Sequence, residues 1–220
     1  MKNLWVQYPG DGFKLRMRLG LTSFKHVGIF PEQAPNWEFI YKKVREAATA
    51  PKVLNLFAYT GGASLAAKAA GADVTHLDSV RQVVSWAREN MEATGLQDIR
   101  WVVEDAMKFA RREAKRGHKY DGIILDPPAY GHGPDGEKWK LDELLFEMLR
   151  TVHEILAPHG WMVLNLYSNG YSAALGETVV REAFGLKADG KDYLMTSGEL
   201  ALNDKFGKAI PLSIYVRLEL

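Results

Sequence analysis

The sequence of 220 residues contains no cysteine. This absence excludes disulfide bonds, metal sites with thiolate ligands and every mechanism that uses a cysteine nucleophile. Long apolar runs are also missing. No window approaches the roughly 18 apolar residues of a membrane span, and the first residues contain no apolar segment of signal-peptide length. We therefore expect a cytoplasmic protein without a membrane partner.

An excess of charge of either sign is missing as well, because 28 Lys and Arg stand against 27 Asp and Glu. A chain with a net charge of +1 has no overall positive field, so a nucleic-acid partner must be held by a local patch or with help from elsewhere. The length and the hydrophobic fraction of 47% are those of one well-buried globular domain.

The first part of the chain predicts a small β-hairpin and a helix. Short β-like runs at 4–8 and 14–21 lie on either side of the turn "PGDG". The following segment, 31–48, begins with a proline. It spaces the apolar residues Trp37, Ile40 and Val44 along one helix face.

From Lys52 onward, strand patterns alternate with helical patterns. The expected strands are 52–59, 73–78, 99–105, 120–126 and 161–168, and the expected helices between them are 62–71, 79–95, 106–117 and 141–160. This alternation predicts an α/β fold with a doubly wound, mostly parallel sheet. A helix near 173–185 and two further strands complete seven strands. No long helix separates those last two, so we expect an antiparallel C-terminal strand pair.

Carboxylates follow several of these strands. In open doubly wound sheets, ligands bind beyond the carboxyl ends of the strands. Three of the expected parallel strands end in Asp78, Asp105 and Asp126. One such Asp is most often a helix N-cap, but three at one rim favour a binding site.

The first strand-to-helix turn argues against a dinucleotide. Gly61 and Gly62 allow a tight corner, yet the turn does not match G-x-G-x-x-G, which binds a pyrophosphate. A match at Gly131, Gly133 and Gly136 is separated from its strand, and we interpret it as a mobile loop over the site. Asp78 stands at about the separation from the first strand at which a carboxylate binds ribose hydroxyls. A ribose without a pyrophosphate fits S-adenosylmethionine.

The segments "VLNLFAYTGGAS", "HLDSV", "VVEDAMKF" and "GIILDPPAY" occur in this order. With them the chain resembles the Rossmann-type (class I) S-adenosylmethionine-dependent methyltransferases over about residues 25–170. Within them it resembles the branch that modifies bases of large-subunit ribosomal RNA. The resemblance implies a Rossmann-like fold, S-adenosylmethionine as cofactor and an RNA substrate. It divides the chain into an N-terminal hairpin and cofactor-covering segment, 1–35, and a methyltransferase domain, 36–220.

The resemblance also implies roles for individual residues. The methionine portion of the cofactor would face Phe57, Tyr59, Thr60 and Gly61, and the ribose would face Asp78. Asp105 would contact the adenine amino group, with Ala106 beside it. The cofactor-covering segment "FKHVGIFPEQ" would contribute Lys25, Phe30 and Gln33. The remaining positions expected to bind the cofactor are Ala63, Ser64, Ser79 and Asp126.

The stretch "IILDPPAYGHGP" predicts the catalytic corner. Consecutive prolines fix φ and have no N–H groups, so Pro127 and Pro128 form a rigid arc with free carbonyl acceptors. Asp126 and the carbonyl of Pro127 can accept hydrogen bonds from an amino or ring N–H group, and Tyr130 can stack on a flat base. Methyl displacement needs alignment above all, so we expect these three residues to be catalytic. The alternative is that Asp126 caps a turn and Tyr130 packs.

The kind of acceptor follows from the missing cysteine. Methylation of a pyrimidine C5 normally uses a cysteine, and similar enzymes with that chemistry carry one after the fifth strand. Here that place holds Tyr167, Ser168 and Asn169. A nucleobase nitrogen is therefore the expected acceptor. A hydroxyl oxygen is less favoured, because no general base stands out.

Other histidines and the basic residues give weaker signals. His76 is expected to face the sheet, and "HEILAPH" lacks the H-E-x-x-H spacing, so we expect no metal. His132 lies next to the acidic corner and could touch the substrate. The basic cluster 111–119 is more typical of a solvated helix face than of an RNA-binding stripe, though it could supply phosphate contacts.

Two alternatives to RNA base methylation stay open. One is a methyltransferase that acts on a small molecule or a protein side chain. It is favoured by the balanced charge and by the lack of the N-terminal RNA-binding domain that similar RNA-modifying enzymes often carry. The other is a cofactor-binding scaffold without activity. The sequence leaves the oligomeric state undetermined.

Overall fold

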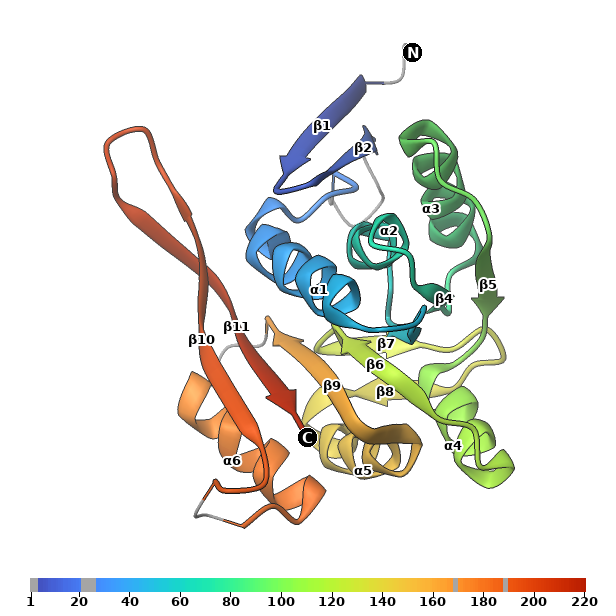
Figure 1. Cartoon of the computed structure of the whole chain (residues 1–220), viewed down its shortest axis with the longest axis vertical. Helices are drawn as coiled ribbons and strands as arrows, with labels where there is room; N and C mark the ends of the chain where they lie inside the picture. Colours follow the sequence, from blue (N-terminus) through green and yellow to red (C-terminus); the bar gives the residue numbers. More distant parts are fainter. Residues whose placement is uncertain (1–3, 21–26, 168–169, 188–189) are drawn as a thin grey trace.

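The computed structural model describes residues 4–20, 27–167, 170–187 and 190–220 (Figure 1). A seven-stranded sheet has the order β10-β11-β9-β6-β3-β4-β5. Its parallel strands are β3 (Lys52–Leu56), β4 (Asp73–Asp78), β5 (Ile99–Val103), β6 (Tyr120–Leu125) and β9 (Leu156–Leu166). The antiparallel strands β11 (Ala209–Glu219) and β10 (Leu194–Asn203) complete it. The predicted mostly parallel sheet with an antiparallel C-terminal pair is confirmed.

Helices cover both faces of the sheet (Figure 1). One layer contains α1 (Ala34–Glu46), α2 (Gly62–Ala69) and α3 (Arg81–Thr94), and the other contains α4 (Ala106–Arg116), α5 (Leu141–Ile155) and α6 (Ala173–Phe184). Each layer buries its own apolar cluster against the sheet. Because β3 leads to β4 and β5 on one side while β6 lies on its other side, the strand order reverses at β3. Ligands bind at such a reversal in open α/β sheets.

The predicted N-terminal hairpin is confirmed as β1 (Leu4–Gly10) and β2 (Phe13–Leu19). It is part of the core, because Leu15 and Met17 on β2 are buried in the same cluster as α1, α2 and β3. A side chain of α3 bonds to a backbone group at the free edge of β2: the backbone N–H of Arg18 donates to Asn90 Oδ1 at 2.8 Å. The hairpin therefore closes one side of the α2–α3 layer.

The helix expected over 141–160 was predicted too long. It ends at Ile155, and β9 begins at the next residue. Pro158 explains the difference, because proline disfavours helical backbone in the residue before it and cannot donate a helix hydrogen bond. His159 then adopts a positive φ of 62°, which turns the chain into the strand.

The segment after β6 also differs from the prediction. It forms a small hairpin of β7 (Tyr130–His132) and β8 (Lys138–Lys140). The glycine match at 131–136 lies in this hairpin and its turn, where Gly136 has a φ of 91°. These glycines therefore serve a hairpin turn that packs against the start of α4, where a Cβ at Gly133 would come within 3.0 Å of Asp105, the N-cap residue of that helix. None of the helices in the described ranges is long and apolar enough to span a membrane.

Candidate active site

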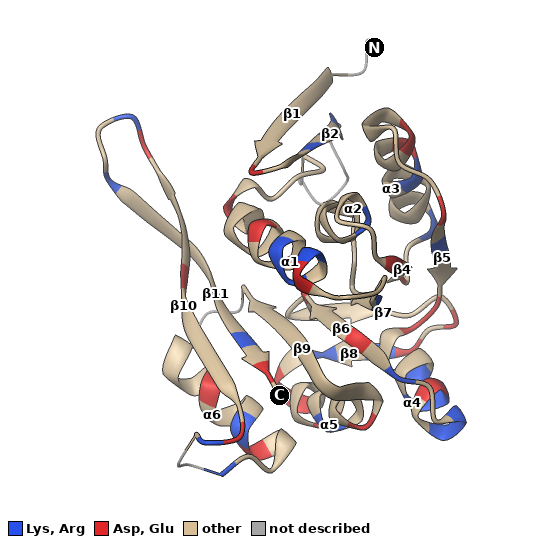
Figure 2. Ribbon diagram, in the orientation of Figure 1, with Lys and Arg blue, Asp and Glu red and all other residues tan. Residues whose placement is uncertain are grey.

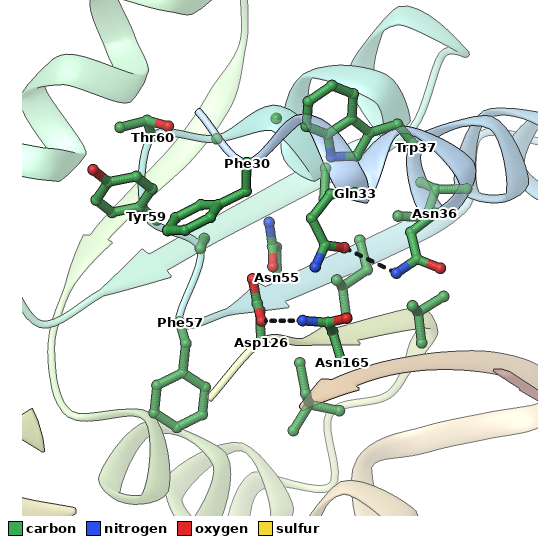
Figure 3. Close-up of a pocket in the computed structure, with 18 of the residues that line it drawn as sticks. Phe30, Gln33, Asn36, Trp37, Asn55, Phe57, Tyr59, Thr60, Asp126 and Asn165 are labelled. Carbon is green, nitrogen blue, oxygen red and sulfur yellow. Dashed lines mark hydrogen bonds between the residues drawn. The ribbon is translucent and has the colours of Figure 1, made fainter. Parts of the chain in front are cut away.

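A pocket lies at the carboxyl ends of β3, β6 and β9, where the strand order reverses (Figure 3). It is bounded by the loop after β3, by the start of α1 and by the segment before α1. Half of its lining residues are polar or aromatic, namely Phe30, Gln33, Asn36, Trp37, Asn55, Phe57, Tyr59, Thr60, Asp126 and Asn165. The pocket brings together eight residues predicted for the cofactor site: Phe30, Gln33, Phe57, Tyr59, Thr60, Gly61, Ala63 and Asp126.

The loop after β3 has an unusual backbone. Phe57 and Tyr59 adopt positive φ values of 57° and 47°, and Gly61 follows with 92°. Non-glycine residues in this region cost free energy and concentrate at functional sites. A side chain at Gly62 would come within 2.6 Å of the Trp37 indole. This close packing brings the loop and the first turn of α2 against the start of α1.

Asp78, at the end of β4, holds this loop in place. Its Oδ2 accepts the backbone N–H of Tyr59 at 2.9 Å, and its Oδ1 accepts the backbone N–H of Val80 at the same distance. Burial raises the pKa of Asp78 above its ordinary value. The carboxylate stands behind the pocket loop, and its contact with a ribose stays a prediction.

The other predicted cofactor residues lie at or beyond the margin of this pocket. Asp105 caps α4 by accepting the backbone N–H of Lys108 at 2.8 Å, with Ala106 buried behind it. Ser64 is fully buried and bonds to Asn55 and His76, and Ser79 follows Asp78. Contacts of these residues with the adenosine stay predictions. Lys25, like Ser168 and Asn169 of the acceptor region, lies outside the described residues.

Asp126 is the carboxylate that faces the pocket directly. Asn165 Nδ2 donates to its Oδ1 at 2.8 Å, and Ser213 Oγ in turn donates to Asn165 Oδ1 at 3.0 Å (Figure 3). Burial raises the pKa of Asp126 to about 7, an effect that the bond from Asn165 opposes and the nearby charge of Glu32 reinforces. With Oδ1 held by Asn165, Oδ2 remains for a ligand.

The two prolines after Asp126 have different surroundings. The indole N–H of Trp139 donates to the carbonyl of Pro128 at 2.7 Å, so the carbonyl of the buried Pro127 is the acceptor left beside Asp126. Tyr130 is 53% exposed, and its hydroxyl lies 2.9 Å from His132 Nε2. The exposed ring of Tyr130 follows Asp126 and the two prolines along the chain, and it is not among the residues that line the pocket.

The segment before α1 covers the pocket. The Phe30 ring lies between the rings of Tyr59 and Tyr167, with both centroid distances 5.5 Å. The 3₁₀ turn η1 (Pro31–Gln33) follows, and Gln33 Nε2 donates to the Tyr167 hydroxyl at 3.0 Å. Phe30 and Gln33 thus line the pocket, and their contact with the cofactor stays a prediction.

The remaining sequence candidates have structural roles. His76 is fully buried, and burial lowers its pKa to about 3, so it is neutral at physiological pH. In the basic cluster 111–119, the three arginines pair with Glu147, Glu104 and Glu113. Figure 2 shows Asp and Glu residues along α4 among its Lys and Arg residues. This pairing favours a solvated helix face. In the described ranges, no three His, Asp or Glu side chains gather as metal ligands.

Sequence reasoning missed several polar residues of the pocket. Asn55 and Asn165 are buried within apolar strands, and Asn36 is buried on α1. The signal was present in "VLNLF" and "VLNLY", where one amide interrupts an apolar run. A buried amide needs partners, so such a residue marks either a hydrogen-bond network or a ligand.

The geometry suits a nucleoside with an amino-acid tail. The glycine-containing corner between β3 and α2 lets backbone approach a ligand, the carboxylate of Asp78 stands behind it, and buried amides and Asp126 line the other side (Figure 3). A site of this kind, at the reversal of a doubly wound sheet, is typical of enzymes that bind a cofactor with a nucleoside portion.

A family model described as S-adenosylmethionine-dependent methyltransferase matches residues 10–191. The chain therefore belongs to this family of enzymes, and S-adenosylmethionine is its cofactor. A solved S-adenosylmethionine-dependent methyltransferase from Agrobacterium tumefaciens is 40% identical, with a TM-score of 0.88 over 98% of this chain and 70% of that one.

Curated relatives are ribosomal RNA methyltransferases. The large subunit methyltransferase K/L of Shewanella frigidimarina is 30% identical over 164 residues, which are 73% of this chain and 22% of that enzyme. The large subunit methyltransferase I of Aeromonas salmonicida is 26% identical over 87% of this chain and 48% of that enzyme. The chain thus spans between about a fifth and a half of these relatives.

Proposed function

We propose that this enzyme transfers the methyl group of S-adenosylmethionine to a nucleobase nitrogen in RNA, most specifically ribosomal RNA. The observation that carries the proposal is the acidic corner: Asp126, which lines the pocket and is oriented by Asn165, is followed along the chain by two prolines and the exposed ring of Tyr130. The names of the relatives from Shewanella frigidimarina and Aeromonas salmonicida support ribosomal RNA as the substrate.

The corner suits a planar nitrogen that carries hydrogen. Asp126 Oδ2 and the Pro127 carbonyl accept its N–H groups, while Tyr130 stacks on the base. The cofactor supplies an electrophilic methyl group on a sulfonium. As the nitrogen–carbon bond forms, the sulfur–carbon bond breaks and S-adenosylhomocysteine leaves. A proton is then lost from nitrogen, and a carboxylate whose pKa is raised to about 7 is matched to receive it near neutral pH.

The test is methyl transfer from labelled S-adenosylmethionine to three separate acceptor pools: unmodified large-subunit ribosomal RNA, total protein and a metabolite extract. We expect label in RNA. The Asp126→Asn variant should lose at least about a hundredfold in rate while binding S-adenosylhomocysteine normally, because it keeps the oxygen that Asn165 holds but loses the proton acceptor.

A stacking role for Tyr130 adds a matched pair of variants. Tyr130→Ala should raise the KM for RNA about tenfold, whereas Tyr130→Phe, which keeps the ring, should stay close to the wild type. Label found in the protein or metabolite pool and absent from RNA would instead establish the second candidate. That candidate is favoured by the ion pairs that neutralise the arginines of 111–119.

A further inference from the structure

A continuous hydrogen-bond chain runs along one wall of the cofactor pocket, to which it contributes Gln33 and Asn36. It begins at Arg217 on β11, whose Nε and Nη2 donate to Asn36 Oδ1 at 3.1 and 2.9 Å. Asn36 Nδ2 then donates to Gln33 Oε1 at 2.9 Å. The chain continues from Gln33 Nε2 to the Tyr167 hydroxyl and from that hydroxyl to Glu32 Oε1, at 3.0 Å each.

The direction of every donor in this chain is fixed by its two ends. A guanidinium only donates, so Asn36 must turn its oxygen towards Arg217 and its nitrogen towards Gln33. The Tyr167 oxygen accepts the N–H of Gln33, and its hydroxyl donates to Glu32 Oε1. A chain that runs in one direction from a cation to an anion polarises its members and strengthens each bond.

This direction determines what the wall offers to a ligand. The oxygens of both amides are occupied by partners within the chain, while each amide nitrogen carries a second N–H. Gln33 and Asn36 both line the pocket, and Figure 3 shows the Gln33 nitrogen turned towards Asn55 and Asp126. The first turn of α2, whose backbone N–H groups carry partial positive charge, lies against the same wall through Trp37. This wall of the pocket therefore presents N–H donors, and it suits a ligand group that accepts hydrogen bonds.

The cofactor has such an acceptor at the end that would face Gln33 and Asn36. The loop that Asp78 holds lies on the opposite side of the pocket from Gln33 and Asn36 (Figure 3). If the ribose lies near Asp78, the amino-acid portion extends to the amide wall, and its carboxylate is an acceptor with no hydrogen to donate.

We propose that Arg217 is a positioning residue which, through Asn36, holds the Gln33 amide so that its N–H binds the carboxylate of the cofactor's amino-acid portion. Arg217 does not line the pocket itself, and it is anchored by cation–π contacts with Phe39 and Tyr215 at 4.7 and 4.3 Å. The inference rests on the cofactor of the family and does not depend on the nature of the methyl acceptor.

The test compares two ligands by calorimetry: S-adenosylhomocysteine, which has the amino-acid portion, and methylthioadenosine, which lacks it. In Arg217→Met we expect the affinity for S-adenosylhomocysteine to fall about tenfold and that for methylthioadenosine to change less than about twofold. An equal loss for both ligands would mean a general structural role for Arg217, and no loss for either would mean that the chain does not act on the pocket. Either result overturns the proposal.

Asn36→Asp separates positioning from folding. The introduced carboxylate keeps the bond to Arg217, now as an ion pair, but it has no N–H for Gln33, so the direction of the chain is lost. We expect the melting temperature to stay within a few degrees of the wild type while binding of S-adenosylhomocysteine falls at least as far as in Arg217→Met. A variant that binds this ligand normally would refute the proposal.

The control is Arg181→Met on α6, where the guanidinium bonds the Tyr193 hydroxyl and Glu177. Both affinities should be unchanged. A wild type that binds neither ligand would overturn the assignment of this pocket to the cofactor, and with it this inference. A wild type that binds both ligands without methylating RNA would affect the proposed acceptor alone.

Discussion

At the scale of single residues, the site depends on buried carboxylates and amides whose orientations are fixed by hydrogen bonds. Asp126 shows this best, because the chain from Ser213 through Asn165 fixes one of its oxygens and leaves the other for a ligand. Burial without a paired cation makes the ionised form costly, which is why the pKa of Asp126 rises to about 7.

This shift predicts a pH-dependent effect on stability. A carboxyl group whose folded pKa lies above its unfolded value stabilises the fold below the unfolded value, near 4, and loses that contribution as pH rises through about 7. Asp126→Asn removes the titration and keeps the oxygen that Asn165 holds. We expect the difference in the free energy of unfolding between the variant and the wild type to shift in favour of the variant by about 3 kcal/mol between pH 4.5 and pH 8.

Denaturant unfolding of both proteins across this pH range measures the effect, and each free energy of unfolding is compared at the same pH. The matched control is Asp121→Asn, which removes an exposed carboxylate at the start of β6. A stability difference between Asp126→Asn and the wild type that does not vary with pH would contradict the shifted pKa.

At the scale of elements, the N-terminal hairpin is part of the fold that builds the pocket. Leu15 and Met17 of β2 are buried with α1 and α2, and Met17 also lines the pocket. Leu15→Ala should lower the free energy of unfolding by about 2–4 kcal/mol, because it leaves a cavity in a close-packed layer. The exposed neighbour Lys14, changed to Ala, should cost less than about 0.5 kcal/mol. A Leu15→Ala protein as stable as the wild type would show that the hairpin is an independent appendage.

Elements with strong periodicity could be predicted from the sequence, and those set by a local contact could not. The alternation of strand and helix patterns from Lys52 onward was sufficient to predict the sheet. The end of α5 depends on Pro158, and the β7–β8 hairpin depends on the Trp139 indole that bonds to Pro128. The indole contact joins two residues that are 11 positions apart in the sequence. The glycines between them favour a loop, so the sequence alone did not predict the hairpin.

At the scale of the whole molecule, residues of both charges are spread over the helices and strands (Figure 2), and several of them form ion pairs. The cluster 111–119 illustrates this, since Arg111 pairs with Glu147 across two helices. Exposed pairs of this kind contribute little free energy. Arg111→Ala combined with Lys115→Ala should therefore leave the rate of methyl transfer to RNA within about twofold of the wild type. A tenfold rise in KM for RNA, with unchanged S-adenosylhomocysteine binding, would show that this helix face does contact phosphates.

The site could be predicted in part at this scale. The loop after β3 and the corner at Asp126 were visible as segments, because their residues are consecutive. Arg217 and Asn165 could not be placed at the site, because their roles depend on the pairing of β11 with β9 near the end of the chain. A charged residue in the apolar run "IYVRLEL" was the available signal, and only the register shows what it touches.

The most direct test of this account is the identity of the methylated nucleoside. Ribosomal RNA is incubated with the enzyme and with S-adenosylmethionine carrying a deuterated methyl group, then digested to nucleosides and analysed by mass spectrometry against standards. We predict a nucleoside methylated on a base nitrogen, formed by the wild type and lost in Asp126→Asn. A 5-methylpyrimidine or a 2′-O-methylated ribose as the product would contradict the proposed role of the acidic corner.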